Sequence, residues 1–152
     1  MILTFCGHAD FQEAAEYKLN VLNFLEKTIG DKKAELYIGG YGKFDEFAYN
    51  CANLYKSTHE NTSIVFVTPY ITPEYQKKHI ESKREKYDAI IYPPIEDKPK
   101  KFAILYRNRY MIEKSDYVIA YIDRTFGGAY QTYKYAKRKG KMIFNLTEKD
   151  FD

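Results

Sequence analysis

Hydrophobic residues occur along this chain in short runs that are separated by segments of helical periodicity. The runs span residues 2–5, 36–38, 63–67, 88–91, 116–122 and 142–146. Most are continuous rather than alternating, which is typical of strands buried on both faces of a parallel sheet. We therefore expect each run to form a strand of one such sheet.

Helical patterns fill the spaces between these runs. The predicted helices span residues 11–29, 43–56, 73–85, 101–115 and a fifth that ends at Gly140. In the first helix, Phe11 and Leu19 belong to the stripe that we expect to face the core. Thr72 and Pro73 are typical of an N-cap and of a first helical position, so they mark the start of the third helix.

The alternation of strands and helices predicts the fold. Strand and helix alternate five times, without a repeat, a linker or a low-complexity segment between them. This order is typical of right-handed crossovers between parallel strands. We expect an α/β fold, a Rossmann-like three-layer sandwich with a mostly parallel sheet and helices on both faces, built from residues 1–152 as one domain.

Glycine gives the strongest indication of a binding site. Of the eight glycines, Gly30 and Gly140 are predicted helix C-caps. The others fall in the loops just after strands, at their carboxyl ends: Gly7, Gly39, Gly40, Gly42, Gly127 and Gly128. Ligands of open α/β sheets bind at that edge, so we expect these six glycines to contact a ligand.

Composition and motifs exclude several classes of protein. The first loop lacks the G-x-G-x-x-G dinucleotide motif, and "GGYGKF" lacks the Ser or Thr of a P-loop. A net charge of +3 predicts no basic face, so we expect no nucleic-acid partner. The two cysteines have no metal-binding spacing, and we expect neither a metal nor a cofactor. Without a leader or a long apolar run, the chain is expected to be cytoplasmic, with no membrane partner.

Polar residues in the first two loops are candidates for chemistry. Asp45 and Glu46 lie at the start of the second helix, where carboxylates often serve only as partners of the helix dipole. If they act on a ligand, they hydrogen-bond ribose hydroxyls or serve as acid and base at a glycosidic carbon. They are therefore catalytic candidates only if the protein is an enzyme. His8 is either a hydrogen-bonding residue of its loop or a ligand contact.

The last glycine loop is a better place for a phosphate. Gly127 and Gly128 expose backbone amides before the fifth helix, and Thr132 adds a hydroxyl. Arg107 lies at the edge of the apolar stripe of the fourth helix, from which it can form a bidentate phosphate clamp. Asn108 is a polar residue within that stripe, and it either bonds to nearby backbone or reaches the site.

The chain resembles the SLOG superfamily, which includes the DNA-processing protein A domain and the lonely-guy phosphoribohydrolases. The resemblance is carried by "TFCGH", "IGGYGKFDEFA", "IFNL" and above all "RNRYMIEKSDYVIAYIDRTFGGAYQTYKYAKRKGK", and it is closest to the YpsA-like bacterial branch. It implies a Rossmann-like sheet that binds a nucleotide. "GGYGKFDE" is similar to the lonely-guy motif G-G-x-G-T-x-x-E, which places Glu46 on the catalytic glutamate and Lys43 on its phosphate-binding Thr.

Two functions remain open at this point. The favoured one is binding of a nucleotide or nucleotide-derived small molecule, as a sensor or a sequestering protein. The alternative is an enzyme that cleaves the N-glycosidic bond of a nucleoside monophosphate or related nucleotide, of the phosphoribohydrolase or deoxyribosyltransferase type. A homo-oligomer is compatible with both.

Overall fold

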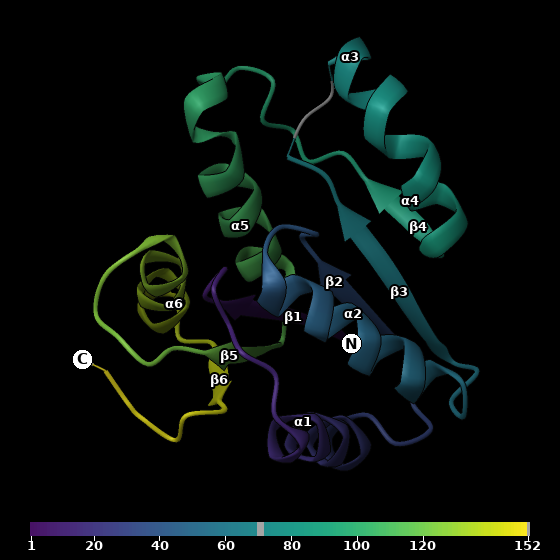
Figure 1. The fold of residues 1–152 in the computed structure, drawn as a ribbon, viewed down its shortest axis with the longest axis vertical. Helices are drawn as coiled ribbons and strands as arrows, with labels where there is room; N and C mark the ends of the chain where they lie inside the picture. The colour runs from purple at the N-terminus through teal and green to yellow at the C-terminus, as the bar shows by residue number, and fades with distance from the viewer. Residues whose placement is uncertain (70–71, 152) are drawn as a thin grey trace.

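The protein is built around one sheet whose strands are all parallel. The computed structural model describes residues 1–69 and 72–151. The strands are β1 (Ile2–Gly7), β2 (Ala34–Ile38), β3 (Thr62–Val67), β4 (Ala89–Ile91), β5 (Tyr117–Tyr121) and β6 (Met142–Asn145). Their order in the sheet is β4-β3-β2-β1-β5-β6 (Figure 1). The central strand, β1, pairs Leu3 with Leu36 of β2 and with Tyr117 of β5.

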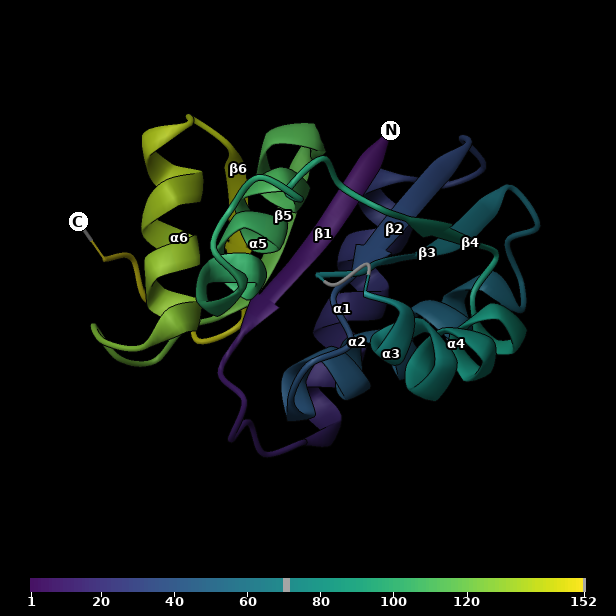
Figure 2. The same ribbon diagram turned by 90° about the horizontal axis from the view of Figure 1, so that it is seen from above.

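Helices cover both faces of this sheet. They are α1 (Ala15–Thr28), α2 (Lys43–Lys56), α3 (Pro73–Tyr75), α4 (Glu81–Lys86), α5 (Ala103–Lys114) and α6 (Gly128–Arg138). A π-helical segment, Gln76–Ile80, joins α3 to α4, and a 3-10 turn, Lys100–Phe102, precedes α5. Figure 2 shows α5 and α6 on one side of the sheet and the other helices on the opposite side. The predicted three-layer α/β sandwich is therefore confirmed.

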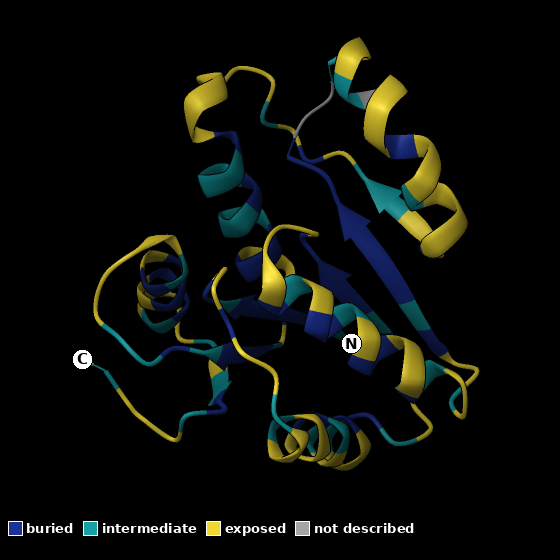
Figure 3. Cartoon of the chain, viewed as in Figure 1, coloured by how far each residue is buried: buried dark blue, intermediate teal, exposed yellow. Residues whose placement is uncertain are grey.

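The alternation of side chains along the central strand builds two cores. Leu3 and Phe5 pack against α1 and α2 in a large core that contains most of the buried aromatic rings. Cys6 points to the other face, where it packs with residues of α6. Both faces of β1 are thus buried (Figure 3), as its continuous apolar run predicts.

The first helix differs from its prediction at two points. It begins at Ala15 rather than at residue 11. Phe11 lies in the preceding loop, where its backbone N–H donates to the carbonyl of His8 and its ring packs on Phe44. Leu19 is 60% exposed, because Val21 and Leu25 form the buried side of the helix instead. An apolar ring can therefore enter the core from a loop as well as from a helix.

The third predicted helix begins where its capping residues indicated. Thr72 Oγ1 accepts a hydrogen bond from the backbone N–H of Tyr75 at 3.2 Å, which is the geometry of an N-cap. The helical path then continues to Lys86. Among the described residues, no helix is long and apolar enough to cross a membrane.

Candidate functional site

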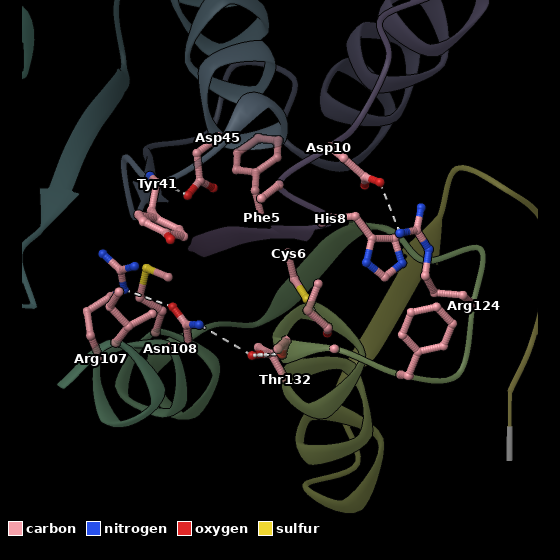
Figure 4. Close-up of a pocket in the computed structure, with 18 residues that line it drawn as sticks. Phe5, Cys6, His8, Asp10, Tyr41, Asp45, Arg107, Asn108, Arg124 and Thr132 are labelled. Carbon is pink, nitrogen blue, oxygen red and sulfur yellow. Dashed lines mark hydrogen bonds and ion pairs between the residues drawn. The ribbon is translucent and has the colours of Figure 1, made fainter. Parts of the chain in front are cut away.

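A cleft of about 360 Å³ opens at the carboxyl edge of the sheet (Figure 4). It lies between the loop after β1, the loop after β2, and the helices α5 and α6. The predicted site residues that line it are Gly7, His8, Asp45, Arg107, Asn108, Gly127, Gly128 and Thr132. Residues from four separate parts of the sequence therefore meet at one edge, as the topology of a parallel sheet requires.

Four of the six predicted glycines make room for the protein's own atoms. A Cβ at Gly7 would lie 2.2 Å from the ring of Phe44, and one at Gly39 would lie 2.8 Å from the guanidinium of Arg107. The other two closed positions are Gly40, against Phe66, and Gly42, against Ala9. Packing alone therefore accounts for these glycines, and a ligand is not needed to explain them.

The remaining two glycines open onto empty space at the start of α6. A Cβ at Gly127 or Gly128 would meet no atom within 4 Å. Gly127 is the N-cap residue, with φ 94° and ψ 170°, and no side chain caps the helix. The first amides of an α-helix have no partner within the helix, and the dipole favours an anion there. The first turn of α6 is thus open to a ligand in the cleft.

Arg107 lies on the floor of the cleft and links two strand ends. It is 1% exposed, at the centre of the buried side of α5 rather than at its edge. Its Nη1 donates to the carbonyls of Gly39 at 2.6 Å and Val67 at 3.0 Å, and its Nε donates to Asn108 Oδ1 at 2.8 Å. The guanidinium therefore joins the ends of β2 and β3 to α5.

Asn108 continues this network to α6. Its Nδ2 donates to Thr132 Oγ1 at 3.4 Å, and that hydroxyl donates to the carbonyl of Gly128 at 3.1 Å. Cys6 Sγ donates to the carbonyl of Ala129 at 3.2 Å. Burial raises the pKa of this thiol, so Cys6 is held as a neutral packing residue and not as a nucleophile. These hydrogen bonds hold the first turn of α6 through the carbonyls of Gly128 and Ala129, and both residues line the cleft.

The two predicted acidic residues are neighbours in the first turn of α2, but only one of them lines the cleft. Asp45 lines the cleft, where its Oδ2 accepts from the backbone N–H of Tyr41 at 2.7 Å. Burial raises the pKa of Asp45 to about 6, against the opposing effect of the Arg107 charge. Glu46 is exposed and lines a neighbouring groove together with Lys83. Asp45 is therefore the carboxylate that can act on a ligand in the cleft.

His8 belongs to an ionic cluster at the other end of the cleft. It is 5% exposed, and its Nε2 accepts from the backbone N–H of Asp123 at 3.4 Å. Burial lowers the pKa of His8, and the charge of Arg124 lowers it further. Arg124 in turn binds Asp123 Oδ1 at 2.7 Å and Asp10 Oδ2 at 3.1 Å. His8 is therefore neutral at pH 7 and supports the cleft wall.

Two exposed aromatic rings at the cleft were not among the residues predicted from the sequence. Tyr41 is 62% exposed and Phe126 is 67% exposed, and both line the cleft. Each ring is adjacent in sequence to a glycine of a predicted ligand-binding loop. An aromatic residue next to a strand-end glycine is therefore the sequence pattern by which these two could have been predicted. Exposed rings at a cleft suit the faces of a nucleobase.

Comparison with known proteins shows similarity at the level of the fold. No protein-family model matches the chain, and no curated protein sequence is significantly similar to it. DNA processing protein A from Helicobacter pylori, a single-stranded-DNA-binding protein, superposes with a TM-score of 0.60 at 19% identity over 99% of this chain and 68% of that one. The Streptococcus pneumoniae protein of that name gives 0.62 at 16% identity, over 94% of this chain.

A third similar structure is that of the molybdenum cofactor carrier protein from Chlamydomonas reinhardtii. It superposes with a TM-score of 0.53 at 17% identity, over 93% of this chain and 73% of that one. The chain spans about half the length of the S. pneumoniae protein, with 49% of that chain covered. The shared feature is the arrangement of the sheet and its helices, and the chain thus has the same Rossmann-like fold as these proteins.

Proposed function

We propose that this protein binds a nucleotide or a nucleotide-derived small molecule in the cleft at the carboxyl edge of its sheet. The observation that carries the proposal is the open first turn of α6. Gly127 and Gly128 are the two site glycines beside which a side chain would meet no atom, and the helix has no side-chain cap. A phosphate fits the free N–H groups and the positive end of the dipole at such a position.

The remaining contacts follow from the positions of the other lining residues. The exposed rings of Tyr41 and Phe126 offer apolar faces for a base. Asp45 offers carboxylate oxygens for the ribose hydroxyls, and Thr132 adds a hydroxyl near the first turn of α6. Arg107 shapes the floor through its bonds to Gly39 and Val67. Two of the similar structures are those of a single-stranded-DNA-binding protein and a molybdenum cofactor carrier, and this supports the proposal of a nucleotide-like ligand.

The proposal can be tested by a substitution that fills the space in front of the first turn of α6. Gly128 has no positive φ, and a Cβ there meets no atom, so Gly128→Val should fold normally and place its methyl groups in the open space. Gln131→Val, an exposed position on the same helix outside the cleft, is the matched control. Both variants and the wild type would be dialysed against nucleoside mono-, di- and triphosphates, NAD and ADP-ribose, and retained ligands identified by mass spectrometry.

The proposal predicts retention of at least one nucleotide by the wild type and by Gln131→Val. We expect Gly128→Val to bind that ligand at least about tenfold more weakly, since the phosphate can no longer approach the amides. Equal affinity in all three proteins would place the ligand elsewhere. Retention of no nucleotide by the wild type would overturn the proposed function.

Cleavage of an N-glycosidic bond is the second candidate, and one observation favours it. The raised pKa of Asp45, about 6, is close to the value that a general acid or base needs near neutral pH. If the protein is an enzyme, Asp45→Asn should abolish release of the free base while nucleotide binding persists. Glu46→Gln, the same chemical change on the neighbouring residue outside the cleft, should leave turnover intact. Absence of any free base in the wild-type reaction would exclude this candidate for the nucleotides tested.

A further inference from the structure

The charges of the chain are distributed very unevenly. Residues 98–114 and 128–141 contain eleven of the 24 Lys and Arg residues but only Glu113 of the 21 Asp and Glu residues. These two segments therefore carry a net charge of +10, and the rest of the chain carries −7. The total of +3 hides this separation, so a low net charge does not by itself exclude a basic face.

The fold brings the two basic segments together. They form α5, α6 and the residues that flank them, and the two helices pack side by side on one face of the sheet (Figure 2). Lys134, Arg138 and Lys139 are exposed on α6, and Lys114 is exposed at the end of α5. Arg109 is half-buried between the helices. We call this surface the α5–α6 face.

Most cations of this face lie against aromatic rings instead of carboxylates. Arg109 lies 5.1 Å from the ring centre of Tyr135, and Arg138 and Lys139 lie 5.2 and 5.4 Å from the same ring. In the described part of the chain, the ion pairs of the basic segments are Lys98 with Asp97 and Lys137 with Asp150. The positive charge of the face is therefore largely uncompensated within the chain.

The same geometry indicates which kind of polyanion fits. The described residues of α5 and α6 include no exposed large hydrophobic side chain, and Tyr135 is 9% exposed beneath its cations. Unstacked bases need open aromatic faces, and a protein partner needs a buried apolar anchor. Neither helix offers such a group, and the one exposed large ring in the two basic segments, Phe102, lies before α5 with Lys101 5.1 Å from its centre. It offers a row of cations, which is what a closely spaced line of phosphates requires.

We propose that the α5–α6 face binds the phosphate backbone of a nucleic-acid duplex without reading its sequence. Backbone contacts of this kind come from Lys and Arg and carry no base specificity. The interaction is separate from the nucleotide cleft, because Lys134, Arg138 and Lys139 do not line that cleft. The face and the cleft can therefore be tested independently.

The experiment measures binding of a fluorescently labelled 20-base-pair duplex by anisotropy, from about 50 to 200 mM salt. The test variant is the triple substitution Lys134→Glu, Arg138→Glu, Lys139→Glu. Its matched control is Lys18→Glu, Lys27→Glu, Lys33→Glu, which changes the net charge equally at exposed positions on and after α1, against the opposite face of the sheet. A second triple, with Gln at the α6 positions, removes the charges without placing acids at the end of that helix. Gly128→Val tests the cleft.

We expect wild-type binding to weaken steeply with salt, and the α6 triple to reduce the slope of log K against log salt by about three. The control triple and Gly128→Val should bind the duplex much as the wild type does. Four results would overturn the proposal: no duplex binding at low salt, tighter binding of a single strand of the same length, equal loss in both Glu triples, or unchanged binding in the Gln triple.

Discussion

At the scale of single residues, the glycines after the strands of this protein fall into two groups with different surroundings. Gly7 and Gly39 are fixed by what lies against them, the ring of Phe44 and the guanidinium of Arg107. Gly127 and Gly128 face open space. The sequence shows only the common result, a glycine after a strand. Which glycines leave space for a ligand depends on partners that are distant in the sequence, such as Phe44 for Gly7 and Arg107 for Gly39, and a single sequence does not reveal these partners.

Arg107 is expected to contribute mainly to stability. Its buried Nη1 donates to two strand-end carbonyls, which Arg107→Met would leave without this donor. We expect the substitution to lower the free energy of unfolding by about 3 kcal/mol, measured by urea denaturation. Arg109→Met, at a half-buried site over tyrosine rings, is the control and should cost about 1 kcal/mol or less. A variant at position 107 as stable as the wild type would show that the guanidinium serves a ligand instead.

The raised pKa of Asp45 predicts a specific pH dependence. An acid whose pKa is about 6 in the folded protein and 3.8 when unperturbed binds its proton more tightly in the folded state. Its favourable contribution is therefore complete below about pH 4 and is lost as the pH rises through 6. Asp45→Asn can still accept from the Tyr41 N–H and should be more stable than the wild type at pH 7.5, by roughly 1–2 kcal/mol.

Urea unfolding of both proteins at pH 4 and pH 7.5 tests this prediction. The difference between them isolates Asp45, because carboxyl groups with lowered pKa values, such as Asp88 and Asp150, are common to both proteins. The stability gap should be small at pH 4 and should open by pH 7.5. A gap that stays constant between the two pH values would show that Asp45 titrates normally.

At the scale of elements, two helices begin in the same way. Gly42 starts α2 with φ 91° and ψ 175°, and Gly127 starts α6 with φ 94° and ψ 170°. Only glycine adopts this backbone conformation readily. The difference lies in the surroundings, since a Cβ at Gly42 would lie 2.8 Å from Cα of Ala9 and one at Gly127 would meet nothing. One start is closed by the first loop, and the other is open to the cleft.

Alanine at these two glycines separates backbone strain from steric overlap. Gly127→Ala should cost about 1–3 kcal/mol of stability, from strain alone. Gly42→Ala should cost at least about 1 kcal/mol more, because Ala9 backbone must also move. The difference in midpoint between their thermal or urea unfolding curves provides the measurement. An equal loss of stability in the two variants would mean that the loop around Ala9 moves away from the new Cβ at no cost in free energy.

Most elements could be predicted from periodicity, and the exceptions have tertiary causes. The second helix has the predicted bounds, residues 43–56, because its stripe and its glycine start coincide in the sequence. The first helix begins later than predicted because Phe11 packs on α2 from the preceding loop. Its spacing from the apolar residues of α1 matches a helical period, so the sequence alone does not distinguish a loop position from a helical one. In the site, Asp45 and Glu46 are adjacent in sequence and equivalent in type. Only the direction of α2 places one in the cleft and the other outside it.

At the scale of the whole molecule, the sheet order predicts where the structure opens first. The central strand β1 is paired on both sides and covered by helices on both faces. The edge strands β4 and β6 are paired on one side, and their residues are mostly exposed or half-buried. Edge strands of this kind open locally, whereas central strands exchange only when the whole domain unfolds.

Native-state hydrogen exchange gives the measurement. Hydrogen-bonded amides of β4 and β6 should exchange at least about 30-fold faster than those of β1 and β2, equivalent to about 2 kcal/mol of opening free energy. Low urea concentrations should speed exchange in β1 more than in β4 or β6, because only global unfolding exposes a large surface. Equal protection in the central and edge strands would contradict this order. The two helical layers would then hold all six strands in one cooperative unit, and the edges would be as stable as the strand that positions the cleft.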